Sequence, residues 1–434
     1  MERIDQKMKK LVYTFLFAVP CAVSAAVSIP EIEAGSVTCV QKSPSRKVEI
    51  GYRLKNAPAI VTIDIMTNGV SIGGEHLSYL SGDVNKVVYE GGNRLITWMP
   101  NKAWPGDKVA ENVTVSVTAW ATNAPPDWMV VSLVDTNGYV RYYAEESAIP
   151  FGVENNLYKT EQMVFRKIPA ANVCYRFGSP MTEKGRSNDK EAPQMVTLKD
   201  DFYLGIYEVT QRQSELITGK RPAYFKNDSC YRFRPVENLS VTAIRGSGSW
   251  PDSGHTVADD SFMGILGART GLYGFDLPTE AEWEFAARAG CGNALYNGKE
   301  LTGDTTSDNL DDIARYRRNG GYATGASSDP ASDSAVEHGT AEVGSFDRNA
   351  YGLYDMLGNV WERCLDRYID FPTVAELESG GPAGDRGSTS SRTIRGGSWK
   401  NDASSIRSAS RNGVGATSSF NHTGFRVWRN AVVR

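Results

Sequence analysis

The sequence predicts an all-β domain followed by an α+β domain, and three observations lead to this division. From about residue 27 to residue 146, short alternations of apolar and polar residues are separated by turn residues. Residues 159–434 instead contain two helix-start signals and long aperiodic stretches rich in Gly, Ser, Asp and Thr. A chain of 434 residues also exceeds what one hydrophobic core normally serves, so two domains are expected.

The first 25 residues show the three-part pattern of a secretory signal peptide. Lysines at Lys7, Lys9 and Lys10 precede the apolar run 11–23, and small residues follow at 24–26. We therefore predict that residues 1–25 are removed and that the protein is exported, either to a periplasm or to the medium. The apolar run is shorter than the roughly 20 residues that a spanning helix needs, so no stable membrane anchor is expected after cleavage.

Charge and cysteine content limit the possible partners. The net charge is −4 with both signs interspersed, which gives no basic stripe for nucleic acid. After cleavage five cysteines remain, and an odd number in an exported protein predicts at least one free thiol or an intermolecular bond. These cysteines are Cys39, Cys174, Cys230, Cys291 and Cys364.

The first domain has the pattern of a β-sandwich. Residues 48–54 and 113–119 alternate apolar with polar side chains, as half-buried strands do. Several such strands at short spacing predict a sandwich of the immunoglobulin or fibronectin type over residues 27–146. The segment 145–158 then connects the two domains.

Four tryptophans of the first domain admit two interpretations. They could form a platform that binds carbohydrate, or they could be core and loop anchors, which is the commoner role of such residues. The four are Trp98, Trp104, Trp120 and Trp128.

Two helices are predicted in the second domain from capping-box spacing. Glu280, Glu282 and Glu284 fall in the first turns of the second helix, where its dipole favours negative charge, so capping accounts for them without a catalytic role. The predicted starts are Thr210 with Gln213 and Thr279 with Glu282, and the predicted stops are Gly219 and Gly290.

The segment Tyr351–Cys364, YGLYDMLGNVWERC, is predicted to be irregular backbone held in a core. Its polar groups need partners, and an oxygen cage of the kind calcium prefers could supply them. The candidate ligands are the side chains of Asp355 and Glu362 and the carbonyls of Gly358 and Val360. The alternative is that the two carboxylates only cap turns and pair with arginines.

Five sequence blocks follow one another over about the last two-thirds of the chain: Phe202–Gln213, Leu277–Gly290, Tyr351–Glu362, Arg395–Trp399 and Gly424–Trp428. In this order they resemble the sulfatase-modifying-factor family, whose founding member is the formylglycine-generating enzyme. The resemblance implies a compact α+β domain with an irregular, C-type-lectin-like fold, held by structural calcium. One calcium site of the family falls on the four candidate ligands named above.

The copper chemistry of that family is not expected here. Its oxygen-dependent members hold copper(I) with two thiolates, soft ligands suited to a soft ion. The matching segment, Lys400–Arg411, contains no cysteine, and the positions that best match the thiols are Ser408 and Ala403. We therefore assign no catalytic residue and regard copper as an improbable cofactor.

Four arginines of the C-terminal region could together bind an anionic ligand. The resemblance suggests instead that several of them pair internally with carboxylates. They are Arg395, Arg407, Arg411 and Arg426.

Together these observations predict an exported, non-catalytic recognition module for a protein, peptide or glycan. Short polar residues of the segment 399–421 would form its ligand-contacting surface, and a solvated loop without a partner is the alternative. A second class of function stays open, an oxidoreductase that converts a substrate cysteine to formylglycine. The candidate contact residues are Trp399, Asn401, Ser405, Ser408, Ser410 and Asn412.

Overall fold

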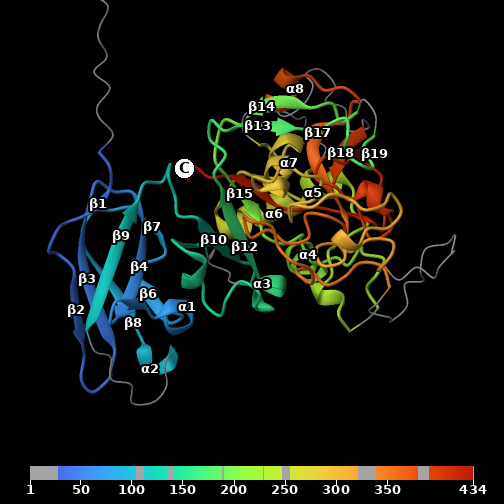
Figure 1. Ribbon diagram of the computed structural model, residues 1–434. Helices are drawn as coiled ribbons and strands as arrows, with labels where there is room; N and C mark the ends of the chain where they lie inside the picture. The colour runs from blue at the N-terminus through green and yellow to red at the C-terminus, as the bar shows by residue number, and fades with distance from the viewer. Residues whose placement is uncertain are drawn as a thin grey trace, which may run out of the picture.

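The structure is a computed structural model, and it describes residues 28–103, 112–134, 140–187, 190–227, 229–246, 255–320, 338–379 and 391–433. A smaller all-β unit and a larger mixed unit lie side by side (Figure 1). The predicted signal peptide and Trp104 fall outside the described residues. Within the described ranges, no helix has the length and apolar character needed to cross a bilayer.

The all-β unit consists of two antiparallel sheets that share one apolar core, to which Ile50, Ile63 and Ile96 contribute. The first sheet has the order β1-β3-β8-β6 with β2 beside β3: β1 Glu31–Ile32, β2 Thr38–Gln41, β3 Val48–Lys55, β6 Leu80–Gly82 and β8 Gly92–Trp98. The second has the order β5-β4-β7 with β9 beside β4: β4 Ala59–Thr67, β5 Val70–Ser71, β7 Lys86–Val88 and β9 Val113–Trp120. Two short helices, α1 Gly73–His76 and α2 Pro100–Ala103, follow strands β5 and β8.

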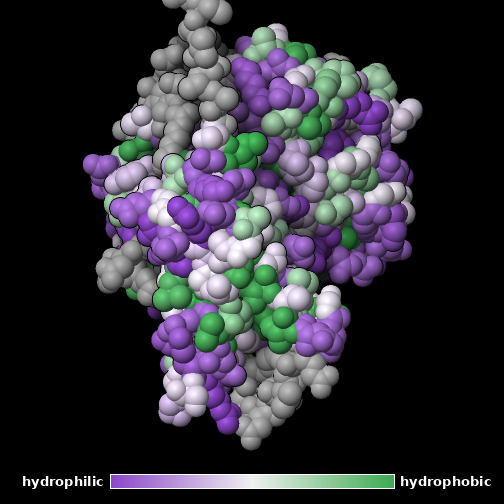
Figure 2. All heavy atoms as spheres, turned by 90° about the vertical axis from the view of Figure 1, so that its left-hand side faces the viewer, coloured by the Kyte–Doolittle hydropathy of each residue, from purple (hydrophilic) through white to green (hydrophobic). Residues whose placement is uncertain are grey.

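The two strands predicted from alternation are confirmed as β3 and β9. Along β3 the side chains of Val48, Ile50, Tyr52 and Leu54 are buried while their neighbours are half-buried or exposed. Such a pattern places one face of the strand on the core. The outward surface of this unit is mainly hydrophilic, with an apolar patch in the lower half of the view in Figure 2.

The predicted domain boundary at residue 146 is wrong, because strands β10 and β11 belong to the second unit. They pair with each other and join a six-stranded sheet in the order β11-β10-β12-β15-β21-β16. Strand pairing across long sequence separations, which local alternation cannot reveal, decides this membership. The bounds are β10 Trp128–Ser132, β11 Val140–Tyr143, β12 Gln162–Ile168, β15 Phe202–Gly205, β16 Phe275–Asp276 and β21 Trp428–Asn430.

Backbone hydrogen bonds join the two units. Tyr142 N donates to Asn85 O over 2.9 Å, and Val433 N donates to Thr122 O over 2.8 Å. Ile60 of β4 lies in the same apolar cluster as Met129 of β10. The C-terminus therefore returns to the boundary between the units, as Figure 1 also shows.

The rest of the second unit combines short strands with a few short helices, which confirms its mixed character. A four-stranded sheet has the order β19-β18-β17-β20, and β13 pairs with β14: β13 Cys174–Phe177, β14 Gln194–Thr197, β17 Trp361–Arg367, β18 Ser391–Arg395, β19 Arg411–Gly415 and β20 Thr423–Gly424. The α-helices are α3 Leu157–Thr160, α4 Gln211–Thr218, α5 Val241–Arg245, α6 Phe262–Thr270, α7 Glu280–Arg288 and α8 Val374–Glu378. Short 3₁₀ turns are η1 Glu146–Ala148, η2 Tyr231–Phe233, η3 Asp308–Leu310 and η4 Ala403–Ser405.

Both predicted helix starts are confirmed. Thr210 and Thr279 are the N-caps of α4 and α7, each in a complete capping box. Gly219 ends α4 in the left-handed conformation, as predicted, whereas α7 ends at Ala289, one residue before the predicted stop.

The glutamates of α7 do more than cap the helix, which corrects the prediction for Glu280 and Glu284. Both are buried, and only Glu282 takes part in the capping box. Glu284 accepts hydrogen bonds from Arg288 Nε over 2.8 Å and from Arg395 Nη2. Glu280 forms a bidentate pair with Arg411, with both N–O distances 2.7 Å. These pairs join α7 to strands β18 and β19.

Replacing Glu284 should destabilise the second unit strongly. Glu284→Gln would leave the buried guanidinium of Arg395 without one of its counter-charges, and removing one partner of a buried pair costs about 3 kcal/mol or more. A matched control is Glu215→Gln, whose 2.9 Å pair with Arg212 is partly exposed and is worth less than about 1 kcal/mol. Urea unfolding followed by circular dichroism measures both, and equal losses in the two variants would contradict the role given to Glu284.

Candidate metal centre and C-terminal surface

Three buried carboxylates, Glu208, Asp355 and Glu362, form what we call the acidic cluster. Glu208 follows β15, Asp355 lies in the irregular segment 351–360, and Glu362 belongs to β17. The irregular backbone predicted from Tyr351 onward is thus confirmed as far as residue 360, after which β17 begins.

The left-handed turn at Gly358 brings this segment against residue 315. Gly358 has a φ of +85°, and a Cβ atom added there would lie 2.3 Å from the carbonyl oxygen of Arg315. Only glycine permits so close an approach of two backbones.

Two members of the cluster accept hydrogen bonds from neighbouring backbone or amide groups. Asp355 Oδ2 accepts from Gly344 N over 2.6 Å, whereas its Oδ1 is buried without a partner. Glu208 accepts from Val360 N over 3.1 Å and from Asn359 Nδ2 over 2.6 Å. An orphaned buried carboxylate oxygen normally indicates a missing water or ion.

Glu362 has stronger partners. It pairs with Arg426 over 2.7 Å and accepts from the indole of Trp283 over 2.8 Å. A cation bound by Glu362 would therefore share this carboxylate with Arg426. This pairing agrees with the alternative to calcium binding, in which Glu362 only pairs with an arginine.

The acidic cluster carries more negative than positive charge. Burial raises the pKa of Glu208 well above its usual range, and the nearby carboxylates of Asp355 and Glu362 raise it further. Burial also raises the pKa of Asp355 to about 6, against the opposing effects of the Gly344 amide and Arg426. A divalent cation at this place would stabilise the ionised carboxylates, and so would offset both the cost of burying them and their mutual repulsion.

The predicted calcium ligands fit a cation only in part. Asp355 offers a free oxygen, and Gly358 and Val360 lie in the same turn with their amides already bonded to Gly396 O and Glu208. Across the described ranges, no three His, Cys, Asp or Glu side chains are grouped to hold a metal. The predicted set has only two such side chains, so calcium stays a prediction.

Glu208 is the member of the cluster that the sequence prediction missed. It stands alone in the apolar run Gly205–Val209, GIYEV. A single carboxylate inside a buried run is costly unless it has a specific partner, and that is the signal which could have identified it.

The structure corrects the predicted ligand-contacting surface. Trp399, Ser408 and Ser410 are buried, so they cannot contact a ligand on the surface, and the prediction is wrong for them. Asn401 is half-buried and accepts from the indole of Trp361 over 2.8 Å. The remaining candidates are Ser405, which is half-buried, and Asn412, which is exposed on β19.

Ion pairs explain why the segment 407–411 lies in the interior. Arg407 is buried and contacts Glu183 over 2.6 Å and Glu191 over 2.7 Å. Together with the pair of Arg411 and Glu280, it holds both ends of the segment 407–411 in the interior. All four C-terminal arginines pair with carboxylates, so their internal pairing, suggested by the resemblance, is confirmed.

The tryptophan platform is also not formed by Trp98 and Trp128. Both are buried, and Trp98 donates its indole N–H to His76 O over 2.8 Å. The interpretation as anchors is correct for both residues, and the small exposed part of Trp128 lines a hollow.

The positions matched to the copper thiols lie in the interior. Ser408 and Ala403 are fully buried, and Ser408 Oγ has no hydrogen-bond partner. The five cysteines of the described ranges form no disulfide within the chain, and the prediction of a free thiol or an intermolecular bond keeps both alternatives. Burial raises the pKa of the Cys364 thiol well above its usual range, which keeps it from acting as a thiolate.

Comparison with known proteins decides the family. The family model that describes the sulfatase-modifying factor enzyme 1-like domain matches residues 158–431 of the sequence. The chain belongs to this family. The match leaves out β10 and β11, although both strands belong to the same sheet as β12.

Relatives in the sulfatase-modifying-factor family differ in the role that their names give. The chaperone protein LppX of Paenibacillus barcinonensis is 32% identical over 212 residues, 44% of this chain and 69% of LppX. The formylglycine-generating enzyme of Thermomonospora curvata is 38% identical over 156 residues, 35% of this chain and 48% of the enzyme. The chain matches only 28% of the serine/threonine-protein kinase pkn1 of Chlamydia caviae, at 29% identity over 54% of its own length. Most of these relatives are thus matched over less than two-thirds of their length.

Solved structures align with about three-fifths of the chain. Treponema denticola variable protein 1 covers 62% of the chain and 95% of its own at 24% identity, with a TM-score of 0.47. PvdO from Pseudomonas aeruginosa covers 62% and 94% at 23% identity, with a TM-score of 0.45.

The raised pKa of Asp355 predicts a pH dependence of stability. Because the folded protein holds this proton more tightly than the unfolded chain, the associated stability is complete below about pH 4 and is lost as the pH rises through about 6. The shift from 3.8 to about 6 corresponds to about 3 kcal/mol. Asp355→Asn has no carboxyl at this position, so it should lack the decrease in the free energy of unfolding that comes from ionisation of Asp355.

The measurement is urea unfolding in chelator between pH 4 and pH 7.5. The control is Asp200→Asn, which replaces an exposed aspartate. Because Asp355 raises the pKa of Glu208, the difference between the two proteins reports the titration of Asp355 together with its effect on Glu208. Identical pH profiles for wild type and Asp355→Asn would contradict the prediction.

Proposed function

We propose that the protein is an exported recognition protein whose sulfatase-modifying-factor domain does not perform the copper chemistry of the formylglycine-generating enzyme. The observation that carries the proposal is the nature of Ser408 and Ala403, the residues matched to the two copper thiols. One offers a buried hydroxyl and the other a methyl group. Neither can replace a thiolate around copper(I).

Two further observations support recognition. The leader-like residues 1–25 favour export, and a relative in the same family, LppX, is named a chaperone rather than an oxidase. The partner would be a protein, peptide or glycan, with Ser405 and Asn412 as the accessible part of the C-terminal surface. We expect no nucleic acid and, after cleavage, no membrane anchor.

The proposal also assigns each unit to a fold family, which goes beyond the sheet topology described above. We assign the two-sheet unit of residues 31–120 to the immunoglobulin-like sandwiches, on the strength of its paired antiparallel sheets and single core. The second unit would have the C-type-lectin-like arrangement of its family, which accommodates its long irregular segments.

Calcium is the cofactor that the acidic cluster supports. Asp355 would supply its unpartnered Oδ1, the carbonyls of Gly358 and Val360 would complete one side, and Glu362 would bind in competition with Arg426. When bound, calcium would neutralise the excess negative charge and fix the segment 351–362.

Calcium should raise the melting temperature of the wild type, and chelator should lower it. Asp355→Ala should be less stable in calcium and should not respond to the ion, whereas Asp200→Ala should respond as the wild type does. Magnesium serves as the matched ion, because its smaller radius and octahedral preference suit this set of ligands less well. If chelator leaves the wild-type melting curve unchanged, the proposed calcium site is wrong.

The alternative function is the oxidation of a substrate cysteine to formylglycine. It is favoured by the formylglycine-generating enzymes among the relatives. A mass-spectrometric assay with purified mature protein, copper(I), oxygen and a peptide bearing a sulfatase-type cysteine motif decides between the two functions.

We expect no formylglycine from this protein, while an active family member run in parallel converts the peptide. Ser408→Cys with Ala403→Cys tests whether the thiols alone are missing. Product that depends on the unaltered protein would overturn the proposal and require another metal site.

A further inference from the structure

Two adjoining hollows are lined by residues of the second unit, and the second of them also contacts the first unit. The first has a volume of about 580 Å³ and is lined by the ends of β10, β11 and β12 and by residues 348–352. The second, of about 800 Å³, lies between α1 of the first unit and residues 146–155. Glu146 and Arg348 line both hollows and pair with each other, so this ion pair is the wall that the two hollows share. We refer to the two hollows together as the groove.

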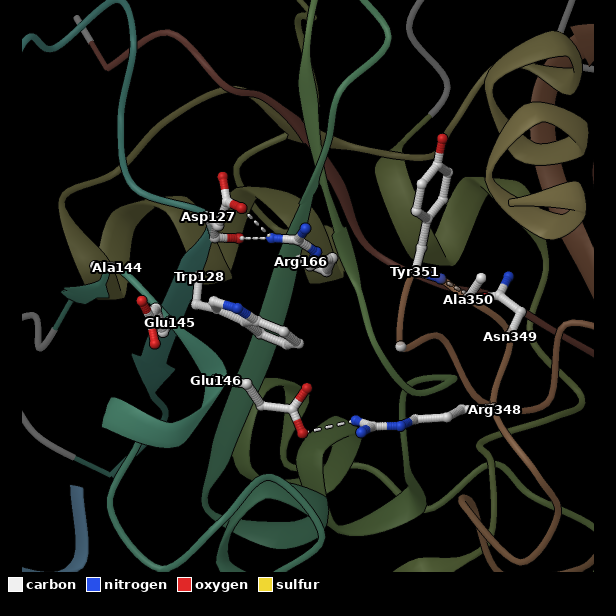
Figure 3. Close-up of a pocket in the computed structure, with 11 residues that line it drawn as sticks. Asp127, Trp128, Ala144, Glu145, Glu146, Arg166, Arg348, Asn349, Ala350 and Tyr351 are labelled. Carbon is white, nitrogen blue, oxygen red and sulfur yellow. Dashed lines mark hydrogen bonds and ion pairs between the residues drawn. The ribbon is translucent and has the colours of Figure 1, made fainter. Parts of the chain in front are cut away.

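Ion pairs frame the first hollow. Arg166 Nη1 lies 2.8 Å from Asp127 Oδ2, and Arg348 Nη1 lies 2.7 Å from Glu146 Oε1. Figure 3 shows the indole of Trp128 between these two pairs. Each of these four charges thus has a partner of opposite sign, and their remaining polar atoms can donate to or accept from an uncharged ligand.

The two arginines are held in place by aromatic rings. The guanidinium of Arg166 lies 5.1 Å from the centre of the Trp128 ring, and that of Arg348 lies 5.8 Å from the centre of the Tyr354 ring. Rigid polar groups of this kind lose little entropy when a ligand binds.

The floor of the first hollow is kept open by a glycine. Gly352 has a φ of +81°, and an added Cβ atom would lie 3.4 Å from the Trp128 ring and 3.7 Å from Arg348 Nη1. Any larger side chain here would occupy the hollow.

Aromatic side chains are accessible in both hollows. Tyr351 is half-buried in the first, and Phe151, in the second, is 53% exposed. Phe151 also has a φ of +65°, a strained conformation for a bulky residue. Strain of this kind together with an exposed ring is more often found where function requires the ring.

We propose that this groove binds a neutral oligosaccharide. Sugar rings combine apolar C–H faces, which pack on aromatic rings, with hydroxyls that hydrogen-bond to carboxylates and guanidiniums. The proposal does not depend on the presence or absence of oxidase activity. It gives the recognition function proposed above a second site, separate from Ser405 and Asn412.

The charges of the groove favour a neutral ligand over an acidic one. Its lining carries four carboxylates and two guanidiniums, and both guanidiniums are paired. An acidic sugar would meet the two surplus carboxylates and would have to displace Asp127 or Glu146 from its arginine. The carboxylates are Glu75, Asp127, Glu145 and Glu146.

An extended peptide is a poorer match. Peptides usually add to an open strand edge or insert apolar side chains into deep pockets. The first hollow instead presents charged side chains around a single indole, and the main chain of β10 within it is already paired on both sides, with β11 and β12.

The test is an array of neutral and acidic oligosaccharides, from disaccharides to hexasaccharides, probed with the full mature chain. Titration calorimetry follows with the neutral glycan that binds best. We expect neutral glycans to be retained and acidic ones not. Tyr351→Ala should weaken binding by about tenfold, as the loss of one ring contact does.

Two further variants separate binding from folding. Phe151→Gly relieves the strained backbone, so its melting temperature should be equal or higher while its glycan affinity falls. Tyr89→Ala removes a ring that is 76% exposed and lies outside the groove lining, and its affinity should stay within about twofold of the wild type.

Several outcomes would overturn the proposal. They are retention of no neutral glycan, selective retention of acidic glycans, binding of a basic peptide panel in place of glycans, or equal loss of affinity in Tyr89→Ala and Tyr351→Ala. None of these results bears on the formylglycine assay, so the two proposals can fail separately.

Discussion

Buried pairs of arginine and glutamate are the interactions on which the second unit depends. Arg395, Arg407, Arg411 and Arg426 all come from the last 40 residues, and each reaches a carboxylate more than 60 positions earlier. A buried charge without its partner costs several kcal/mol, so these pairs restrict which segments can meet. In a unit whose strands and helices are short, these pairs add to the order that regular hydrogen bonding supplies.

Arg363 is the exception to this pairing. Its side chain is buried, and only one of its nitrogens, Nη2, donates a hydrogen bond, to Ser418 O over 2.6 Å. Burial lowers its pKa to about 10.

Local signals in the sequence predicted local structure well. The capping boxes at Thr210 and Thr279 and the alternation in β3 and β9 depend only on neighbouring residues, and all are confirmed. The boundary at residue 146 and the surface role of Ser408 and Ser410 were wrong, because strand partners and ion pairs distant in sequence decide them. The groove was not predicted at all, since its walls come from segments up to 280 residues apart.

The sharing of one sheet by β10, β11 and β12 has a practical consequence. A fragment that starts at residue 158, where the family match begins, would lack the strand that pairs with one side of β12. That side would then expose unpaired N–H and C=O groups beside the apolar residues Met163, Val164 and Phe165. A bare edge of this kind is a template for aggregation through strand addition. Solubility of the isolated family domain therefore depends on residues that family boundaries exclude.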